Sequence, residues 1–177
     1  MPTVSRHQFT RAADALSFMT SGKAIITAAN PQTGRRFTFK VTAANEGEAF
    51  FVSVKKDGRF VYMGIIDRAK QFKRTGKSRV QPDESEFIAF TWVYANLKAG
   101  QIKAPLEVWH EGRCGRCGRT LTVPTSIARG IGPECAGKFL RNSQFVTRPQ
   151  QANLLLPTPK KPGLDEIDLI EKGEVPW

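Results

Sequence analysis

The sequence predicts an α+β protein whose body is a small antiparallel β-meander or an OB-like barrel with two helices. Three observations predict it: short runs of β-branched and aromatic residues between turn signals, two segments with helical periodicity, and a change of pattern after about residue 105. We expect four parts, namely a β-rich basic body over 1–105, a cysteine module over 106–142, a proline-rich linker over 143–163 and a disordered acidic tail over 164–177.

The two predicted helices lie near the start and near the end of the body. Residues 9–19 place apolar side chains on one helical face, and Gly22 is the expected stop. Residues 82–100 begin with acids, carry Lys98 near their end and stop at Gly100, which is the charge order that a helix dipole favours.

The strands are predicted from runs with period-two alternation. In the run over 35–44, Phe37 and Phe39 alternate with Arg36 and Lys40, which gives one apolar and one basic face. Asp57-Gly58 is a convincing hairpin turn because this pair tolerates positive φ. The expected strands are 23–29, 35–44, 49–55 and 59–66, followed by 101–109, which leads into the cysteine module.

Charge is the strongest global signal. The net charge is +11, with +15 over residues 1–163 and −4 over residues 164–177. A basic body that meets a polyanion is one interpretation, and an ordinary basic protein is the other. No apolar run approaches the roughly 20 residues that a membrane span needs, and the first residues lack the pattern of a signal peptide. We expect no membrane contact and a cytoplasmic location, in the host cytoplasm if the chain is viral.

Three cysteines define the module. Cys114 and Cys117 form a C-x-x-C pair followed by Gly118, the spacing with which two thiolates of a zinc knuckle grip one ion. Cys135 follows Pro133 in the first turn of a predicted helix, where the helix dipole favours a thiolate. This order predicts a treble-clef or zinc-ribbon-like module with structural Zn²⁺, and three thiols without a metal are the alternative.

The fourth ligand is less clear from the sequence. It usually lies three residues after the helix cysteine, but Lys138 stands there and cannot serve. His110 gives the spacing H-x3-C-x2-C-x17-C, so we expect a Cys3His site with His110. Glu111 and Glu134 are the alternatives, because carboxylates also bind zinc.

The stretch CGRCGRTLTVPTSIARGIGPECAGKF resembles a short cysteine domain of unknown function found in bacterial and bacteriophage proteins, which implies a structural metal site. Part of it, SIARGIGPECAGKFL, is also similar to the helix–hairpin–helix motif, in which glycines and a helix start cradle DNA phosphates. The alternative is that the glycines only shape the turn that delivers Cys135. Nearby arginines favour phosphate contact in either case.

Basic and aromatic residues are interleaved along the body. Single-stranded nucleic acid binding uses this pairing, because cations follow the phosphates while rings stack on bases. Most rings are expected in the core, and Phe51, Tyr62, Phe72 and Trp92 are the candidates for exposure. We expect single-stranded DNA or RNA to contact Arg35, Arg36, Lys40, Lys55, Lys56, Arg59, Tyr62, Lys70, Phe72, Lys73, Arg74, Lys77, Arg79, Arg113, Arg116 and Arg119.

The tail, GLDEIDLIEKGEVPW, is acidic and ends in an acid–apolar–proline–aromatic order. It resembles the C-terminal tip of bacterial single-stranded DNA-binding proteins, apart from Lys172 within the acidic run and a tryptophan in place of the usual phenylalanine. The resemblance implies that Glu174, Val175, Pro176 and Trp177 dock partner proteins of replication or recombination. An ordinary solvated tail is the alternative.

Together these features predict a non-enzymatic nucleic-acid-binding protein, with single-stranded DNA binding in replication or recombination as the leading hypothesis and a bacteriophage as a natural home. The alternative is a zinc-braced adaptor or inhibitor that binds protein and has no nucleic-acid activity. An enzyme is the least favoured class. The sequence offers no tight acid cluster that could hold a pair of metal ions, and its two histidines leave few candidates for a general base.

Overall fold

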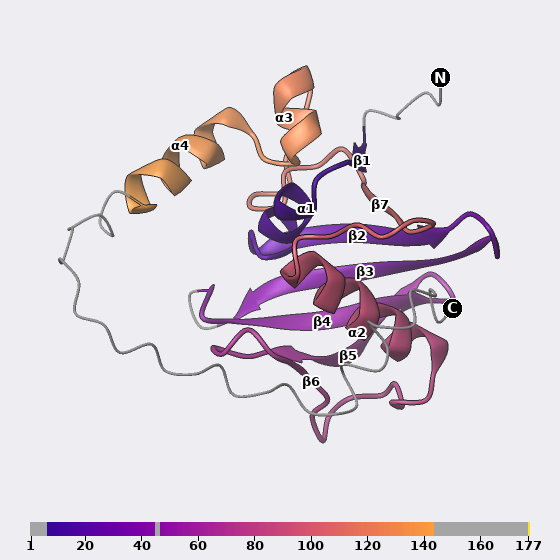
Figure 1. Ribbon diagram of the computed structural model, residues 1–177. Coiled ribbons are helices and arrows are strands. Elements are labelled where there is room, and N and C mark those ends of the chain that lie inside the picture. Colours follow the sequence, from indigo (N-terminus) through magenta and orange to yellow (C-terminus); the bar gives the residue numbers. More distant parts are fainter. Residues whose placement is uncertain (1–6, 45–46, 144–176) are drawn as a thin grey trace, which may run out of the picture.

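The computed structural model describes residues 7–44, 47–143 and 177, which form a seven-stranded antiparallel sheet with helices against one of its faces (Figure 1). The strand order is β1-β7-β2-β3-β4-β5-β6. The strands are β1 (Gln8–Phe9), β2 (Lys23–Asn30), β3 (Arg35–Ala44), β4 (Ala49–Lys56), β5 (Arg59–Ile66), β6 (Phe72–Lys73) and β7 (Glu107–His110). The helices are α1 (Ala12–Met19), α2 (Ser85–Lys98), α3 (Pro124–Arg129) and α4 (Pro133–Ser143).

The sheet is open. Strands β2 to β6 form a meander in which each strand pairs antiparallel with the next. The edge strands β1 and β6 have two residues each and do not pair with each other within the described part of the chain. Such short edges offer too few backbone groups to close a ladder. The α+β class and the meander are therefore confirmed, and the OB-like barrel is not what the chain forms.

Strand β7 is the main departure from the predicted strand order. It inserts between β1 and β2, with Val108 opposite Phe9 on one side and Ala28 on the other. The strand that leads into the cysteine module is thus built into the body's own sheet. The sheet continues across the expected boundary at residue 105, and the module is joined to the body by hydrogen bonds as well as by the chain.

Helices α1 and α2 cover one face of this sheet, and the core lies beneath them (Figure 1). Phe90 of α2 packs edge-on against Phe39, with ring centroids 5.0 Å apart. Trp92 is 2% exposed, so the expectation that this ring could reach solvent was wrong. Helix α2 is apolar around most of its circumference, because it contacts α1 as well as the sheet. Among the described helices, none is long and apolar enough to cross a bilayer.

Candidate metal centre and uncovered sheet face

A tight turn holds the first two cysteines. Arg113 and Thr120 form a β-bridge, and the Cys114 N–H donates to the Arg119 carbonyl at 2.8 Å. Gly118 closes the turn by donating to the Cys114 carbonyl, and its φ of +79° is the left-handed conformation that glycine adopts without strain. The Cys114–Cys117 pair therefore lies in a tight turn closed by backbone hydrogen bonds, as the zinc-knuckle spacing predicts.

Cys135 completes a three-thiol cluster from the first turn of α4. The three sulfur atoms lie within 4.8 Å of one another, and in the described residues no His, Asp or Glu joins this group. Sulfurs bound to one tetrahedral zinc ion lie about 3.8 Å apart, given Zn–S bonds of about 2.3 Å. Small side-chain movements would bring the cluster to that spacing, so these three residues could hold a metal ion.

The thiols differ in acidity. Burial raises the pKa of Cys114, but backbone N–H groups of Gly132, Cys117 and Arg116 donate to its sulfur and lower that pKa to about 7. Burial and hydrogen bonds to the other two sulfurs raise the pKa of Cys135 to about 11. Three thiolates cannot coexist this closely without a cation to neutralise them. A divalent ion would replace the protons that the metal-free cluster retains.

His110 lies outside the three-cysteine cluster in this structure, unlike in the expected Cys3His set. Its Nε2–H donates to the Ile127 carbonyl at 2.7 Å, and its Nδ1 accepts the Gly112 N–H at 3.0 Å. Because β7 alternates, His110 faces the covered side of the sheet, among the rings of Phe9 and Phe18. Burial lowers its pKa, so the imidazole is neutral and links β7 to α3.

The alternative ligands are not in place either. Glu134 pairs instead with Arg119, at 3.3 Å between Oε2 and Nη1, and both side chains are largely exposed. Glu111 is exposed and lines a different cavity. Among the described residues, neither His110, Glu111 nor Glu134 is therefore placed as a fourth metal ligand.

The module is fixed against helix α1. A Cβ at Gly115 would lie 2.2 Å from the Ser21 hydroxyl oxygen, and one at Gly130 would lie 2.4 Å from the Phe18 ring. The Lys23 N–H donates to the Gly115 carbonyl at the start of β2. Among the glycines of the stretch similar to the helix–hairpin–helix motif, Gly130 thus packs closely on the body, and its φ of +70° forms the turn between α3 and α4.

The second candidate site is the sheet face that no described helix covers, here called the open face. Alternation places basic, aromatic and small polar side chains on it. Its rings include Phe51 and Phe60, which are 47% and 38% exposed. The residues that define the open face are Lys23, Ile25, Thr27, Ala29, Arg36, Thr38, Lys40, Thr42, Phe51, Ser53, Lys55, Phe60, Tyr62, Ile65, Lys73, Glu107 and Trp109.

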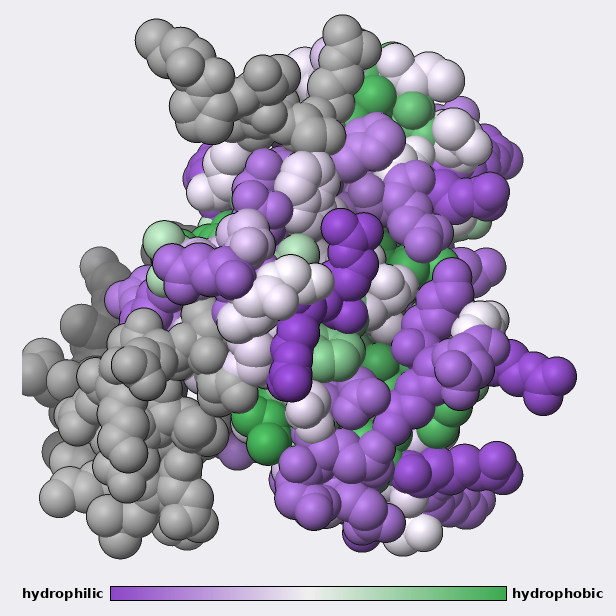
Figure 2. All heavy atoms as spheres, turned by 90° about the vertical axis from the view of Figure 1, so that its right-hand side faces the viewer, coloured by the Kyte–Doolittle hydropathy of each residue, from purple (hydrophilic) through white to green (hydrophobic). Residues whose placement is uncertain are grey.

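Rings and cations alternate across the open face. The Lys40 ammonium lies over the Phe60 ring, 5.6 Å from its centroid, and Phe51 packs edge-on against Tyr62 at 6.0 Å. Hydrophilic side chains also cover the end of the sheet at the β2–β3 hairpin, where Arg35 and Arg36 are exposed (Figure 2). Exposed rings and basic side chains therefore share this face of the sheet.

Two hollows indent this face. One, of about 310 Å³, is lined by Thr27, Ala29, Arg36, Glu107 and Trp109. The other, of about 390 Å³, lies where the sheet meets the cysteine module, and three cations line it: Lys23, Lys40 and Arg113. The open face and the cysteine module thus form one continuous basic surface.

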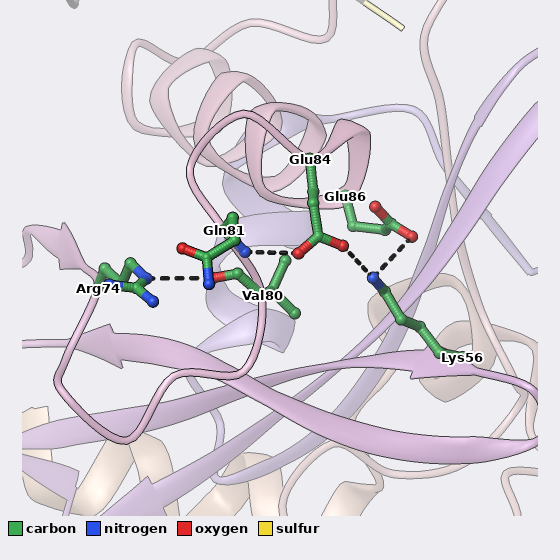
Figure 3. A network of polar contacts seen from close by, with 6 residues as sticks. All are labelled: Lys56, Arg74, Val80, Gln81, Glu84 and Glu86. Carbon is green, nitrogen blue, oxygen red and sulfur yellow. Dashed lines mark hydrogen bonds and ion pairs between the residues drawn. The ribbon is translucent and has the colours of Figure 1, made fainter.

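Several predicted nucleic-acid contacts lie elsewhere. Lys56 turns to the helix side and pairs with Glu84 and, at 3.3 Å, with Glu86 (Figure 3). The hydrogen bond to Glu84 raises the pKa of Lys56. Arg74 donates from Nε to the Val80 carbonyl at 3.2 Å and so braces the loop before α2 (Figure 3). These two side chains are structural in this arrangement.

Phe72 and Lys70 are also on the helix side. The Phe72 ring packs against Phe87 and Phe90, and the Lys70 ammonium lies over the ring of Phe50. Phe72 is therefore not an exposed stacking ring. Of the remaining predicted contacts, Arg36, Lys40, Lys55, Tyr62 and Lys73 are on the open face, Arg35 and Arg59 are at hairpin ends, Lys77 and Arg79 are in the loop after β6, and Arg113, Arg116 and Arg119 are in the module.

Trp177 is the one residue of the predicted tail that the structure describes, since Glu174, Val175 and Pro176 lie outside the described residues. Trp177 is 4% exposed on the helix-covered side of the sheet. Its ring packs edge-on against Phe37 at 5.6 Å, and its backbone oxygen accepts from Asn30 Nδ2 at 2.8 Å. In this arrangement the ring is not presented to a partner.

The rings that the sequence marked as candidates for exposure did not include two rings of the open face, Phe60 and Trp109. Both were within reach of the alternation rule, because Phe60 is two residues from Tyr62 and Trp109 alternates with the buried Val108. What the sequence could not supply was the pairing of β7 with β2, which brings Trp109 opposite Thr27.

The fold and the cluster define an α+β protein with an open antiparallel sheet and a three-cysteine module. Residues 104–140, which span β7, the cysteine turn and most of α4, match the model of a family of unknown function (DUF6011). The comparisons with curated proteins and with solved structures gave no match. This match agrees with the expected resemblance of the module to a short cysteine domain of unknown function. Nothing in the comparisons identifies the tail with that of the single-stranded DNA-binding proteins.

Proposed function

We propose that this protein binds single-stranded nucleic acid on the open face of its sheet, with single-stranded DNA as the leading candidate ligand. The observation that carries the proposal is the combination of exposed rings and cations on one face, represented by Lys40 over Phe60. Rings stack on unpaired bases of any sequence, while cations neutralise the phosphates that connect them.

A single strand suits this surface better than a duplex. The bases of a duplex are stacked on one another and expose their edges, so rings such as Phe51 and Phe60 would find no base face to cover. A strand with splayed bases could lay successive bases on the rings across β4 and β5, since adjacent strands lie about 4.8 Å apart.

The cysteine module extends the same surface. The cavity lined by Lys23, Lys40 and Arg113 joins the sheet to the module and concentrates three positive charges against one carboxylate, that of Glu111. This is a suitable place for a phosphate group. A zinc ion at Cys114, Cys117 and Cys135 would keep the turn that carries Arg113 in place.

Titration of fluorescent oligonucleotides tests the proposal. Five cations of the open face and the joining cavity are available to phosphates: Lys23, Arg36, Lys40, Lys55 and Arg113. If all five act, a plot of log affinity against log salt should have a slope of about −3.5 for single strands. Binding should be weaker for duplex of the same length. Absence of binding even at low salt would contradict the proposal.

The adaptor hypothesis has a distinct signature. A basic protein that acts on an acidic partner should recover that partner from lysate after nuclease treatment while showing no affinity for oligonucleotides. Such a result would show that the open face recognises a protein and not a nucleic acid.

A further inference from the structure

We propose that a metal ion bound by Cys114, Cys117 and Cys135 keeps a fourth coordination position for a small anionic ligand from outside the chain, for which a thiolate is the best match. The inference rests on the metal centre of the proposed function. It differs from the expected closed site, in which the protein supplies four ligands and the metal is purely structural.

The chain has few donors left for this position. Its three cysteines are all in the cluster, and its two histidines are both described. His110 has both ring nitrogens engaged, and the His7 ring packs beside it with centroids 5.3 Å apart. Neither histidine belongs to the cluster. A fourth protein ligand would have to be a carboxylate, and the nearest in sequence, Glu134, is paired with Arg119.

There is space for an outside ligand. All three cysteines line one cavity of about 290 Å³, together with residues that include Thr120, Ser126 and Lys138. A water molecule occupies about 30 Å³ in the liquid, so this cavity has room for a ligand larger than water beside the ion. A closed structural site would instead have a fourth protein donor atom beside the three sulfurs.

The charges of the cavity allow an anion to approach the ion. Three thiolates around a divalent ion leave one net negative charge, which would repel a further anion in isolation. Arg119 and Lys138 line the same cavity and supply two positive charges, against one negative charge from Glu134. Lys138 stands where a fourth protein ligand was expected, so its ammonium can attract the anion that the chain does not supply. Soft thiolate donors suit a zinc ion already bound by thiolates.

Cobalt substitution tests this inference on the full chain. The Co²⁺-loaded protein, prepared without chloride, is titrated with 2-mercaptoethanol and, separately, with azide. We expect the visible d–d bands to shift with both ligands and a thiolate-to-cobalt charge-transfer band to grow with 2-mercaptoethanol. Arg119→Gln and Lys138→Gln, both at exposed positions, should weaken azide binding by up to about fivefold and leave the response to neutral imidazole unchanged.

Two results would overturn the inference in different ways. A spectrum that is unchanged in the wild type but responds in Glu134→Gln would show that the Glu134 carboxylate closes the site. If the protein binds neither Co²⁺ nor Zn²⁺, the metal centre itself is refuted. If the bound Co²⁺ does not respond to any added ligand, the metal centre stands and the open coordination position is refuted.

Discussion

Lys40 and Phe60 lie on strands that are not neighbours, yet the ammonium of Lys40 sits 5.6 Å from the centroid of the Phe60 ring. Strand β4 separates them, and its small Ser53, which pairs with Lys40, leaves the long lysine side chain free to cross. For the proposed function, the pair would place a cation for a phosphate next to a ring for a base before any ligand arrives.

Replacing Phe60 with alanine should weaken single-strand binding without changing its salt dependence. A lost stacking contact costs roughly 1–3 kcal/mol per base, so the dissociation constant should rise by about fivefold or more. Phe60→Tyr keeps a stacking ring and should bind within about twofold of the wild type. The measurement is an oligonucleotide titration at several salt concentrations.

Lys40→Gln provides the complementary variant. Loss of one phosphate contact should reduce the magnitude of the salt slope by about 0.7, and Phe60→Ala should leave the slope unchanged. Lys98→Gln, at the end of α2 on the helix side, is the matched control and should alter neither property. Equal effects of Lys40→Gln and Lys98→Gln would show that net charge, and not the open face, governs binding.

Metal analysis should find one zinc ion per chain. Cys135→Ser removes a ligand from the cluster and should reduce the zinc content to near zero after dialysis. Chelation should make the segment from Cys114 to α4 more sensitive to protease while β2 to β5 stay protected, because the body has its own core. His110→Gln should retain the metal. Loss of zinc from this variant would instead support the Cys3His site.

Acid should destabilise the fold through His110. Burial is the main cause that lowers the pKa of His110 in the folded state. Below about pH 6.5, the unfolded chain therefore binds a proton at this histidine that the folded chain does not yet bind. The stability that neutral His110 contributes is full above that pH and falls as the pH drops towards the folded pKa. Urea midpoints at pH 7.5 and 5.5 should differ more for the wild type than for His110→Gln. Parallel losses in both proteins would assign the effect to other groups.

Trp177 should be coupled to Phe37 in stability. Edge-on aromatic pairs contribute about 0.5–1.5 kcal/mol beyond the area they bury. A double-mutant cycle with Phe37→Ala and Trp177→Ala should therefore give a coupling free energy of unfolding in that range. Additive effects of the two substitutions would place the Trp177 ring in solution, where it could contact a partner as the tail resemblance implies.

Local rules predicted much of the fold. The strand over 35–44 has the predicted bounds, and its alternation correctly placed Phe39 in the core and Lys40 on the exposed face. The turn at Asp57-Gly58 and the body helices were likewise predictable, because each depends on residues close in sequence. The cysteine cluster was predictable for the same reason, since two of the cysteines are three residues apart and the third lies in the first turn of a helix.

Pairings distant in sequence were not predictable. The H-x3-C spacing of His110 suits a metal ligand, but the pairing of β7 with β2 fixes which face its side chain takes, and that face leads to Phe18 and α3. Lys56 was expected beside nucleic acid, and the acids at the start of α2 hold it instead. In both cases a tertiary contact decided the role of a side chain that local pattern left open.

Photocrosslinking tests the central claim most directly, because it reports the surface that nucleic acid touches. A single-stranded oligonucleotide with a photoreactive base is crosslinked to the full chain, and the modified peptides are identified by mass spectrometry. We expect crosslinks at Phe51, Phe60, Tyr62 or Trp109, and their loss in excess unlabelled single strand. Crosslinks confined to the helix side, for example at Phe72 or Phe87, would contradict binding on the open face.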